Sequence, residues 1–175
     1  MPKNVEIGFV THPTYKIIDD KAYVYLFGKQ KNGESFLSIN EYRPYFSIKS
    51  EDVKKAKPII DRQDITGEYE IRETDNIDFS GNKVSRIILS IPKDVAKLRR
   101  ELENSEIRCY EADVRFEYRF MMDMGVKGSL AIQGSPLKET RDILVENEKY
   151  NVNNVYLNPE ITGTQEEDYR LSLFS

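Results

Sequence analysis

Few side chains in the sequence have the chemistry of a catalyst. A nucleophilic site needs an activated Ser or Cys beside a base. The chain has one histidine, His12, which precedes Pro13 in a predicted loop, and one cysteine, Cys109, on a predicted strand. We expect Cys109 to be a small buried hydrophobic residue rather than a nucleophile. The nine glycines fall singly at turns and form no phosphate-binding loop, so we predict no catalytic residue in this chain.

The acidic residues closest to a metal-binding pattern are Glu111 and Asp113, two positions apart. Two-metal phosphoryl transfer needs several acids that converge on one point. We expect instead that Asp113 caps a helix and that Glu111 is solvated or paired with an arginine. A zinc cluster is not expected with one cysteine and one histidine. The sequence therefore predicts neither a metal nor a cofactor in this chain.

The charge balance limits how the chain can meet nucleic acid. It has 26 Lys and Arg against 30 Asp and Glu, a net charge of -4, which argues against coating a phosphate backbone with the whole surface. Contact would have to occur at a local patch. The candidate basic clusters are Lys54, Lys55 and Lys57; Lys93, Lys97, Arg99 and Arg100; and Arg115 and Arg119.

Cysteine usage and hydropathy predict the compartment. A single cysteine excludes an internal disulfide framework and suits the reducing cytoplasm. No apolar run approaches the roughly 20 residues that a membrane helix needs, and the start of the chain has no signal-peptide core. We predict a cytoplasmic protein without membrane contact.

Residue patterning predicts an α+β fold that starts with a β-hairpin subdomain. Val5–Val10 has the composition of a strand, and Ala22–Lys29 alternates between two faces. Asn32-Gly33 then supplies the pair preferred in a type I′ turn, and Ser35–Ile39 returns as the partner strand.

The next stretch, about residues 44–111, follows the strand–helix–strand–strand–helix–strand order of a ferredoxin-like unit. The expected strands are Tyr45–Lys49, Tyr69–Arg72, Val84–Ile91 and Ile107–Glu111. The expected helices are Glu51–Lys57, which Pro58 helps to end, and a helix opened by Pro92 that buries Val95, Leu98 and Leu102. RNA-binding sheets of this order stack bases on central aromatic residues, and Val84–Ile91 has none, so we do not expect that platform.

A helix and an irregular C-terminal segment complete the expected fold. The helix should run to Met124, with Asp113 as its N-cap and Gly125 as its C-terminal stop, and a short strand should follow over Leu130–Ile132. Beyond it we expect a meandering connection that contains a strand near Val152–Leu157. The final strand, Tyr169–Phe174, would end at the terminus without a partner, as if the chain were cut inside a longer polypeptide.

Three segments together resemble the family B DNA polymerases of archaea. They are Tyr42–Phe46 (YRPYF), Pro92–Val95 (PKDV) and Tyr110–Gly128 (YEADVRFEYRFMMDMGVKG), so that the resemblance covers about residues 4–134. In addition, Leu171–Phe174 (LSLF) is similar to the strand that leads into the Asp-x-Glu motif of the proofreading exonuclease. The resemblance implies that residues 1–134 are an N-terminal template-binding domain. Residues 135–175 would then connect to an exonuclease domain absent from this chain.

This resemblance implies a non-catalytic domain that binds single-stranded template and recognises uracil ahead of the active site. The implied uracil- and template-binding residues are Phe9, Pro44, Tyr45, Val95, Val114, Phe116 and Arg119, with Arg43 and Arg115 as phosphate contacts. In such a pocket apolar side chains exclude the C5 methyl of thymine by overpacking. Main-chain groups near Tyr45 and Val114 would reject cytosine, which has a donor at C4 where uracil has an acceptor. Arg119 would be a structural support rather than a base reader.

Two positions depart from the family's pattern. Phe9 stands where tyrosine is common, so a hydroxyl bond to Arg119 is lost, and Arg115 stands where proline is common, which changes the wall or adds a phosphate contact. The implied parent is a DNA-directed DNA polymerase that uses Mg²⁺ and is a monomer. The implied partners are single-stranded template DNA and the exonuclease and polymerase domains of the same parent chain. Two alternatives stay open: a polymerase scaffold domain without base sensing, and a stand-alone ferredoxin-like interaction module.

Overall fold

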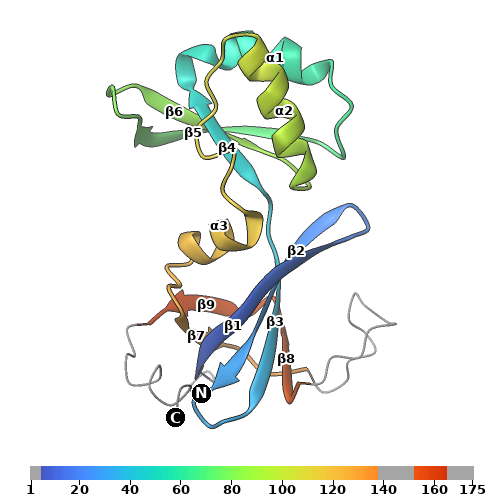
Figure 1. The fold of residues 1–175 in the computed structure, drawn as a ribbon, viewed down its shortest axis with the longest axis vertical. Helices are drawn as coiled ribbons and strands as arrows, with labels where there is room; N and C mark the ends of the chain where they lie inside the picture. Colours follow the sequence, from blue (N-terminus) through green and yellow to red (C-terminus); the bar gives the residue numbers. More distant parts are fainter. Residues whose placement is uncertain (1–4, 138–151, 165–175) are drawn as a thin grey trace. The chain divides into compact units, whose positions relative to one another are not determined.

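The computed structural model describes residues 5–137 and 152–164, which form two compact units. The first unit contains the chain up to Ile18, the stretch Tyr23–Tyr42 and the chain from Phe116 onward. The second contains Asp19–Ala22 and Arg43–Arg115. Strands and helices occur in both units, and the predicted α+β class is confirmed (Figure 1). None of the helices in the described part of the chain is long and apolar enough to span a bilayer.

The first unit is built on a six-stranded sheet in the order β8-β3-β2-β1-β7-β9. Its strands are β1 (Val5–Ile18), β2 (Lys21–Gln30), β3 (Ser35–Glu41), β7 (Ser129–Gln133), β8 (Asn154–Leu157) and β9 (Glu160–Gly163). The predicted hairpin is confirmed, because β2 and β3 pair antiparallel from Tyr23↔Glu41 to Lys29↔Ser35. Gly33 has φ of 90° in its turn, a conformation that glycine adopts without steric cost. The first strand is longer than predicted and continues to Ile18.

Strand β8 corresponds to the strand expected near Val152–Leu157, whereas β9 lies where we expected an irregular connection. β8 pairs parallel with β3 and β9 pairs antiparallel with β7, so this segment supplies both edges of the sheet. A buried side-chain network holds β8: Gln30 Nε2 donates to the Tyr156 hydroxyl at 2.7 Å and Asn154 Nδ2 donates to Gln30 Oε1 at 2.7 Å. The domain division at residue 134 stays a prediction, and the strand expected over Tyr169–Phe174 lies outside the described residues.

Helix α3 begins later than the sequence predicts. It spans Phe116–Asp123, so Asp113 lies three positions before its first residue and does not cap it. Glu111 has φ of 60°, and the backbone between it and the helix turns irregularly. The predicted C-terminal stop is confirmed, because Gly125 has φ of 73° and Val126 N donates to Met121 O at 2.8 Å.

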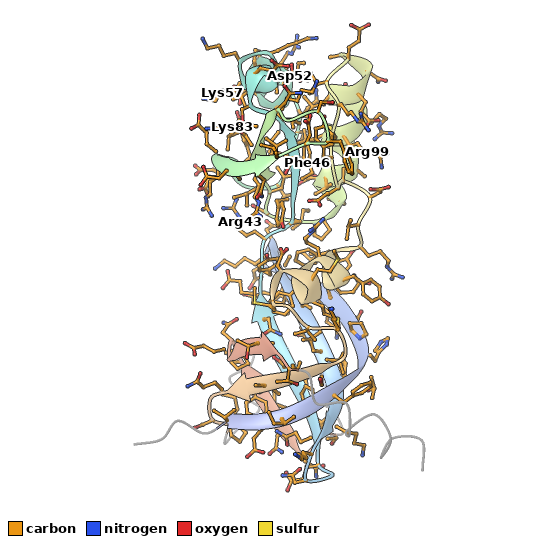
Figure 2. All side chains as sticks on the ribbon, turned by 90° about the vertical axis from the view of Figure 1, so that its left-hand side faces the viewer. Arg43, Phe46, Asp52, Lys57, Lys83 and Arg99 are labelled. Carbon is orange, nitrogen blue, oxygen red and sulfur yellow. The ribbon has the colours of Figure 1, made fainter. Side chains whose placement is uncertain are left out.

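The second unit has a three-stranded antiparallel sheet in the order β4-β6-β5, with helices α1 and α2. The elements are β4 (Tyr45–Lys49), a 3₁₀ turn (Ser50–Asp52), α1 (Val53–Asp61), β5 (Glu70–Ile77), β6 (Lys83–Ile88) and α2 (Lys93–Asn104). Phe46 is fully buried in the core between sheet and helices, whereas Lys57 and Lys83 are exposed (Figure 2). α2 buries Val95, Leu98 and Leu102, as its predicted apolar stripe requires.

Two details of this unit differ from expectation. Pro58 lies inside α1, which continues to Asp61 because Ile59 and Ile60 extend its buried face. The fourth strand predicted over Ile107–Glu111 is wrong, since this segment makes one isolated bridge between Tyr110 and Ser47. Glu106 and Glu111 have φ of 64° and 60°, and these left-handed positions bracket the segment and prevent a regular strand. The predicted ferredoxin-like unit therefore lacks its last strand.

Candidate nucleic-acid interface

In the first unit, helix α3 forms an aromatic cluster with two tyrosines. Phe116 and Phe120 lie one turn apart on the buried face of the helix. The Tyr42 ring stacks on Phe116 with centroids 6.1 Å apart and meets Phe120 edge-on at 5.0 Å. Tyr15 of β1 meets Phe116 edge-on at 5.4 Å. Such ring pairs add stability beyond the area they bury, so the orientation of Phe116 is fixed from two sides.

A polar tether, formed by Arg119, Asp123 and the Tyr42 hydroxyl, also holds this cluster. Arg119, only 7% exposed, pairs with Asp123 one turn later, with Nη1 3.7 Å from Oδ1. The Tyr42 hydroxyl donates to Asp123 Oδ2. Because a buried cation is stable only when paired, Asp123 stabilises the Arg119 guanidinium. The supporting role of Arg119 in template binding stays a prediction. Sequence reasoning missed Tyr42 and Asp123 as site residues, although the i,i+4 spacing of Arg119 and Asp123 is visible in the sequence.

Phe9 lies on β1 opposite Ser129 of β7 and is half-buried. Its ring packs on the backbone of Gly128, where an added Cβ would lie 3.2 Å from Phe9 Cε2. Val10 N donates to Gly128 O at 2.8 Å. The glycine therefore permits a close approach between the Phe9 ring and the chain leading into β7.

In the second unit, Pro44 and Tyr45 are buried at the start of β4. Pro44 O accepts a hydrogen bond from Leu89 N at 2.9 Å, and Tyr45 pairs with Ile88. The Arg86 guanidinium lies over the Tyr45 ring, 4.4 Å from its centroid, a cation–π contact. The Pro44 carbonyl is therefore already used, in a hydrogen bond that extends the pairing of β4 with the β6 strand.

Val95 has a core role within its own unit. It is 8% exposed and belongs to the apolar cluster that includes Phe46, Leu89 and Leu98. Val114 is half-buried and Arg115 is exposed in the turn before α3. The burial of Val95 is therefore accounted for by packing within the core of its own unit.

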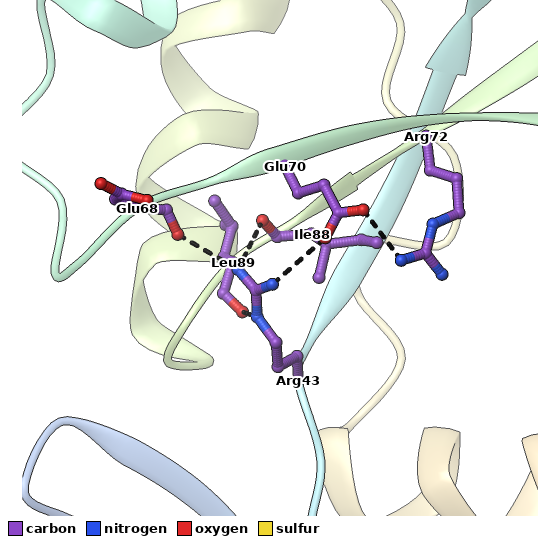
Figure 3. A network of polar contacts seen from close by, with 6 residues as sticks. All are labelled: Arg43, Glu68, Glu70, Arg72, Ile88 and Leu89. Atoms are coloured by element: carbon purple, nitrogen blue, oxygen red, sulfur yellow. Dashed lines mark hydrogen bonds and ion pairs between the residues drawn. The ribbon is translucent and has the colours of Figure 1, made fainter.

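Arg43 joins the start of β4 to the other strands of its sheet (Figure 3). Its Nε donates to Leu89 O at 3.2 Å and its Nη2 to Glu68 O at 3.1 Å. Nη1 lies 3.4 Å from Glu70 Oε2, and Glu70 also pairs with Arg72 at 2.8 Å. A phosphate contact by Arg43 would have to compete with these acceptors.

The predicted site residues are divided between the two units. Phe9, Phe116 and Arg119 belong to the first, whereas Pro44, Tyr45, Val95 and Val114 belong to the second, together with Arg43 and Arg115. The uracil pocket stays a prediction.

The structure also bears on the residues considered for catalysis or metal binding. Burial, with the nearby Glu103 charge, raises the pKa of the Cys109 thiol to about 12, so the thiol stays protonated and unreactive. In the part of the chain that the structure describes, no group of three or more His, Cys, Asp and Glu side chains is placed to hold a metal ion.

Comparisons with known proteins show which proteins this chain is similar to. No family model matches it. It is 28% identical over 134 residues, 68% of this chain, to a DNA polymerase of Methanocaldococcus jannaschii. Its fold matches the family B DNA polymerase from the hyperthermophilic archaeon Pyrobaculum calidifontis with a TM-score of 0.71, over 91% of this chain and at 23% identity. The resemblance to archaeal family B DNA polymerases is confirmed.

This chain corresponds to a small part of each of these polymerases. It spans 8% of the M. jannaschii relative and 20% of the P. calidifontis chain. The match to the family B polymerase structure covers 91% of this chain, more than the 68% covered by the sequence match.

Proposed function

We propose that this chain is a non-catalytic part of a DNA-directed DNA polymerase that binds single-stranded template and recognises uracil ahead of the active site. The observation that carries the proposal is the similarity to the M. jannaschii DNA polymerase over 134 residues. The parent would be a cytoplasmic monomer with exonuclease and polymerase domains, and it would use Mg²⁺.

The aromatic cluster on α3 supports base binding. Phe116 is 5% exposed and is held by Tyr15 and Tyr42, so its position is set before any ligand arrives. A ring this deeply buried has no open face for stacking, so Phe116 would support the site from beneath. The ring of this cluster that a base could reach is Tyr15, which is 39% exposed, and stacking on such a ring contributes about 1–3 kcal/mol per base. Turning a base out of a strand costs least when the strand is already unpaired, which suits a template ahead of the active site.

Uracil and thymine differ only in the C5 methyl group. A wall formed by Val95 and Pro44 would exclude that methyl group by overpacking, which costs about 1–3 kcal/mol. Cytosine would leave a buried donor or acceptor unpaired, at a cost of about 1–3 kcal/mol. These two penalties are enough for a selective site without any charged base reader.

The test compares two fluorescein-labelled single strands that differ only in one central uracil or thymine. We expect the chain to bind the uracil strand about ten-fold more tightly in fluorescence anisotropy, equivalent to about 1.4 kcal/mol. Val95→Gln should abolish this preference. Affinity for both strands should fall as salt rises, because phosphate contacts release counterions.

Leu98→Ala serves as the matched control, because Leu98 is fully buried on the same helix as Val95. It should lower stability and leave the uracil preference intact, and circular dichroism would show that each variant is folded. Equal loss of preference in both variants would mean that core damage, rather than a lost pocket wall, explains the Val95→Gln result.

A scaffold role without base sensing is the second candidate. It is favoured by the core position of Val95 and by the contacts that occupy the Arg43 guanidinium. Equal affinity of the wild-type chain for both strands would support it. Failure to bind either strand at low salt would count against any nucleic-acid role for the isolated chain.

A further inference from the structure

The second unit contains a hollow of about 610 Å³ beside the β5–β6 hairpin, apart from the residues assigned above to template binding. Ser47, Val84, Arg86 and Tyr110 lie along the sheet side of this groove. Residues 75–79 of the hairpin and Glu111 complete it. All of these residues belong to one unit, so the groove is complete within it.

Hydrogen bonds to the Asp78 carboxylate hold the hairpin loop that borders the groove. Asp78 Oδ1 accepts hydrogen bonds from the backbone N–H groups of Ser80 and Asn82, each at 2.9 Å. Asp78 Oδ2 accepts the Tyr110 hydroxyl at 3.0 Å, which ties the loop to the segment on the far side of β4. The groove is therefore preformed, which lowers the ordering cost of binding.

Two large apolar side chains stand exposed on this rim. Phe79 is fully exposed at 108% and Ile77 is 64% exposed. The pairing of β5 with β6 shifts register between Glu73 and Ile77, an irregularity typical of functional edges. Adjacent exposed apolar residues on such a turn mark a protein interaction site rather than a solvated loop.

The charges around the groove select the partner. Asp75, Asp78 and Glu111 line it, against Arg86 in the lining, which lies over the Tyr45 ring, and Arg108, which lies over the Tyr110 ring. Hydrogen bonds from the loop, led by the Asn82 N–H, lower the pKa of Asp78 and keep it ionised. This excess of negative charge repels phosphate and attracts Lys and Arg side chains.

We propose that this groove binds an extended segment of a partner protein in which basic side chains flank an aromatic or aliphatic one. The apolar side chain packs on Phe79 and Ile77, and the flanking cations face Asp75 and Glu111. An extended backbone can lie across the face of the sheet that Ser47, Val84 and Arg86 line.

The test uses the whole 175-residue chain and three probes. The first is a capped peptide Lys-Lys-Phe-Leu-Lys-Lys, the second is the same peptide with Glu in place of Lys, and the third is a single-stranded oligothymidine. We expect the basic peptide to shift backbone amide NMR signals of residues 75–79, 84–86 and 110–111, with a dissociation constant below about 1 mM. The acidic peptide and the oligothymidine should leave these signals in place.

Two variants locate the binding. Phe79→Ser should weaken the basic peptide about ten-fold, and Asp75→Lys up to about five-fold. Their matched controls are Tyr118→Ser, an exposed aromatic residue of the other unit, and Glu51→Lys, an exposed acid outside the groove, both with unchanged affinity. Three results would overturn the proposal: unchanged affinity of the Phe79→Ser variant for the basic peptide, tighter binding of oligothymidine at these amides, or no binding of the basic peptide to the wild-type chain.

Discussion

The two units of the chain are stabilised in different ways. The second unit is built almost entirely from one stretch, Arg43–Arg115, around an aliphatic core of isoleucines, leucines and valines. The first unit collects strands from distant parts of the sequence, and its helix α3 is held by packed rings and by the ion pair of the buried Arg119 with the exposed Asp123. Aliphatic burial is nondirectional, whereas ring stacking and ion pairing fix geometry. The geometry of the α3 cluster is thus fixed by specific contacts, and the aliphatic core stabilises the second unit through burial.

Truncation in the aliphatic core should give the largest effect. Leu98 is fully buried on α2, so Leu98→Ala should lower the free energy of unfolding by about 2–5 kcal/mol through lost burial and a cavity. Urea unfolding followed by circular dichroism would measure it. Arg100→Ala, on the exposed face of the same helix, should stay within about 0.5 kcal/mol. Similar effects of the two changes would mean that the α2 face is not the core of this unit.

A smaller loss is expected from the polar tether in the first unit. Tyr42→Phe keeps the ring contacts with Phe116 and Phe120 and removes the hydroxyl that donates to Asp123. The acceptor is charged but solvent-exposed, so the change should cost about 0.5–1.5 kcal/mol. Tyr15→Phe is the matched control, since Tyr15 meets Phe116 through its ring edge. If both variants unfold at the same urea concentration as the wild type, the tether contributes nothing and the comparison between the units fails.

The smallest effect concerns the hairpin loop and its dependence on pH. Hydrogen bonds hold the pKa of Asp78 below its unfolded value, so ionised Asp78 stabilises the loop above that value, and the contribution is lost as pH falls through the folded pKa. Amide NMR shifts of Ser80 and Asn82, followed from neutral pH to about pH 2, should report this local transition. Asp78→Asn should remove it, whereas Asp75→Asn should leave it unchanged.

Local elements were the most predictable part of the fold. The Asn32-Gly33 turn, the apolar stripe of α2 and the Gly125 helix stop each depend on residues within a few positions of one another. Predictions that depended on one marker residue did worse. Asp113 caps no helix and Pro58 does not end α1, because packing of Phe116 and of Ile59 and Ile60 decides where these helices run.

For the candidate site, the sequence indicated residue types but not their contacts. The resemblance drew attention to Phe116 and Arg119, and the structure adds Tyr42 and Asp123 as the residues that hold them. The groove beside the β5–β6 hairpin had no signal in the sequence. The groove arises where the segment that ends at Tyr110 and Glu111 lies next to the hairpin loop at Asp78. This segment is bracketed by the left-handed residues Glu106 and Glu111.

The sequence by itself determined the α+β class, the first hairpin, the aliphatic face of α2 and the relationship to archaeal family B DNA polymerases. Only the tertiary structure decided that β8 and β9 complete the first sheet, that the last predicted strand shrinks to one bridge, and that Arg43 binds its own sheet. The physical reason is how far apart in the sequence the interacting residues lie. Turns, caps and helical stripes depend on neighbouring residues, whereas strand pairing and buried polar contacts join residues more than a hundred positions apart, such as Gln30 and Tyr156.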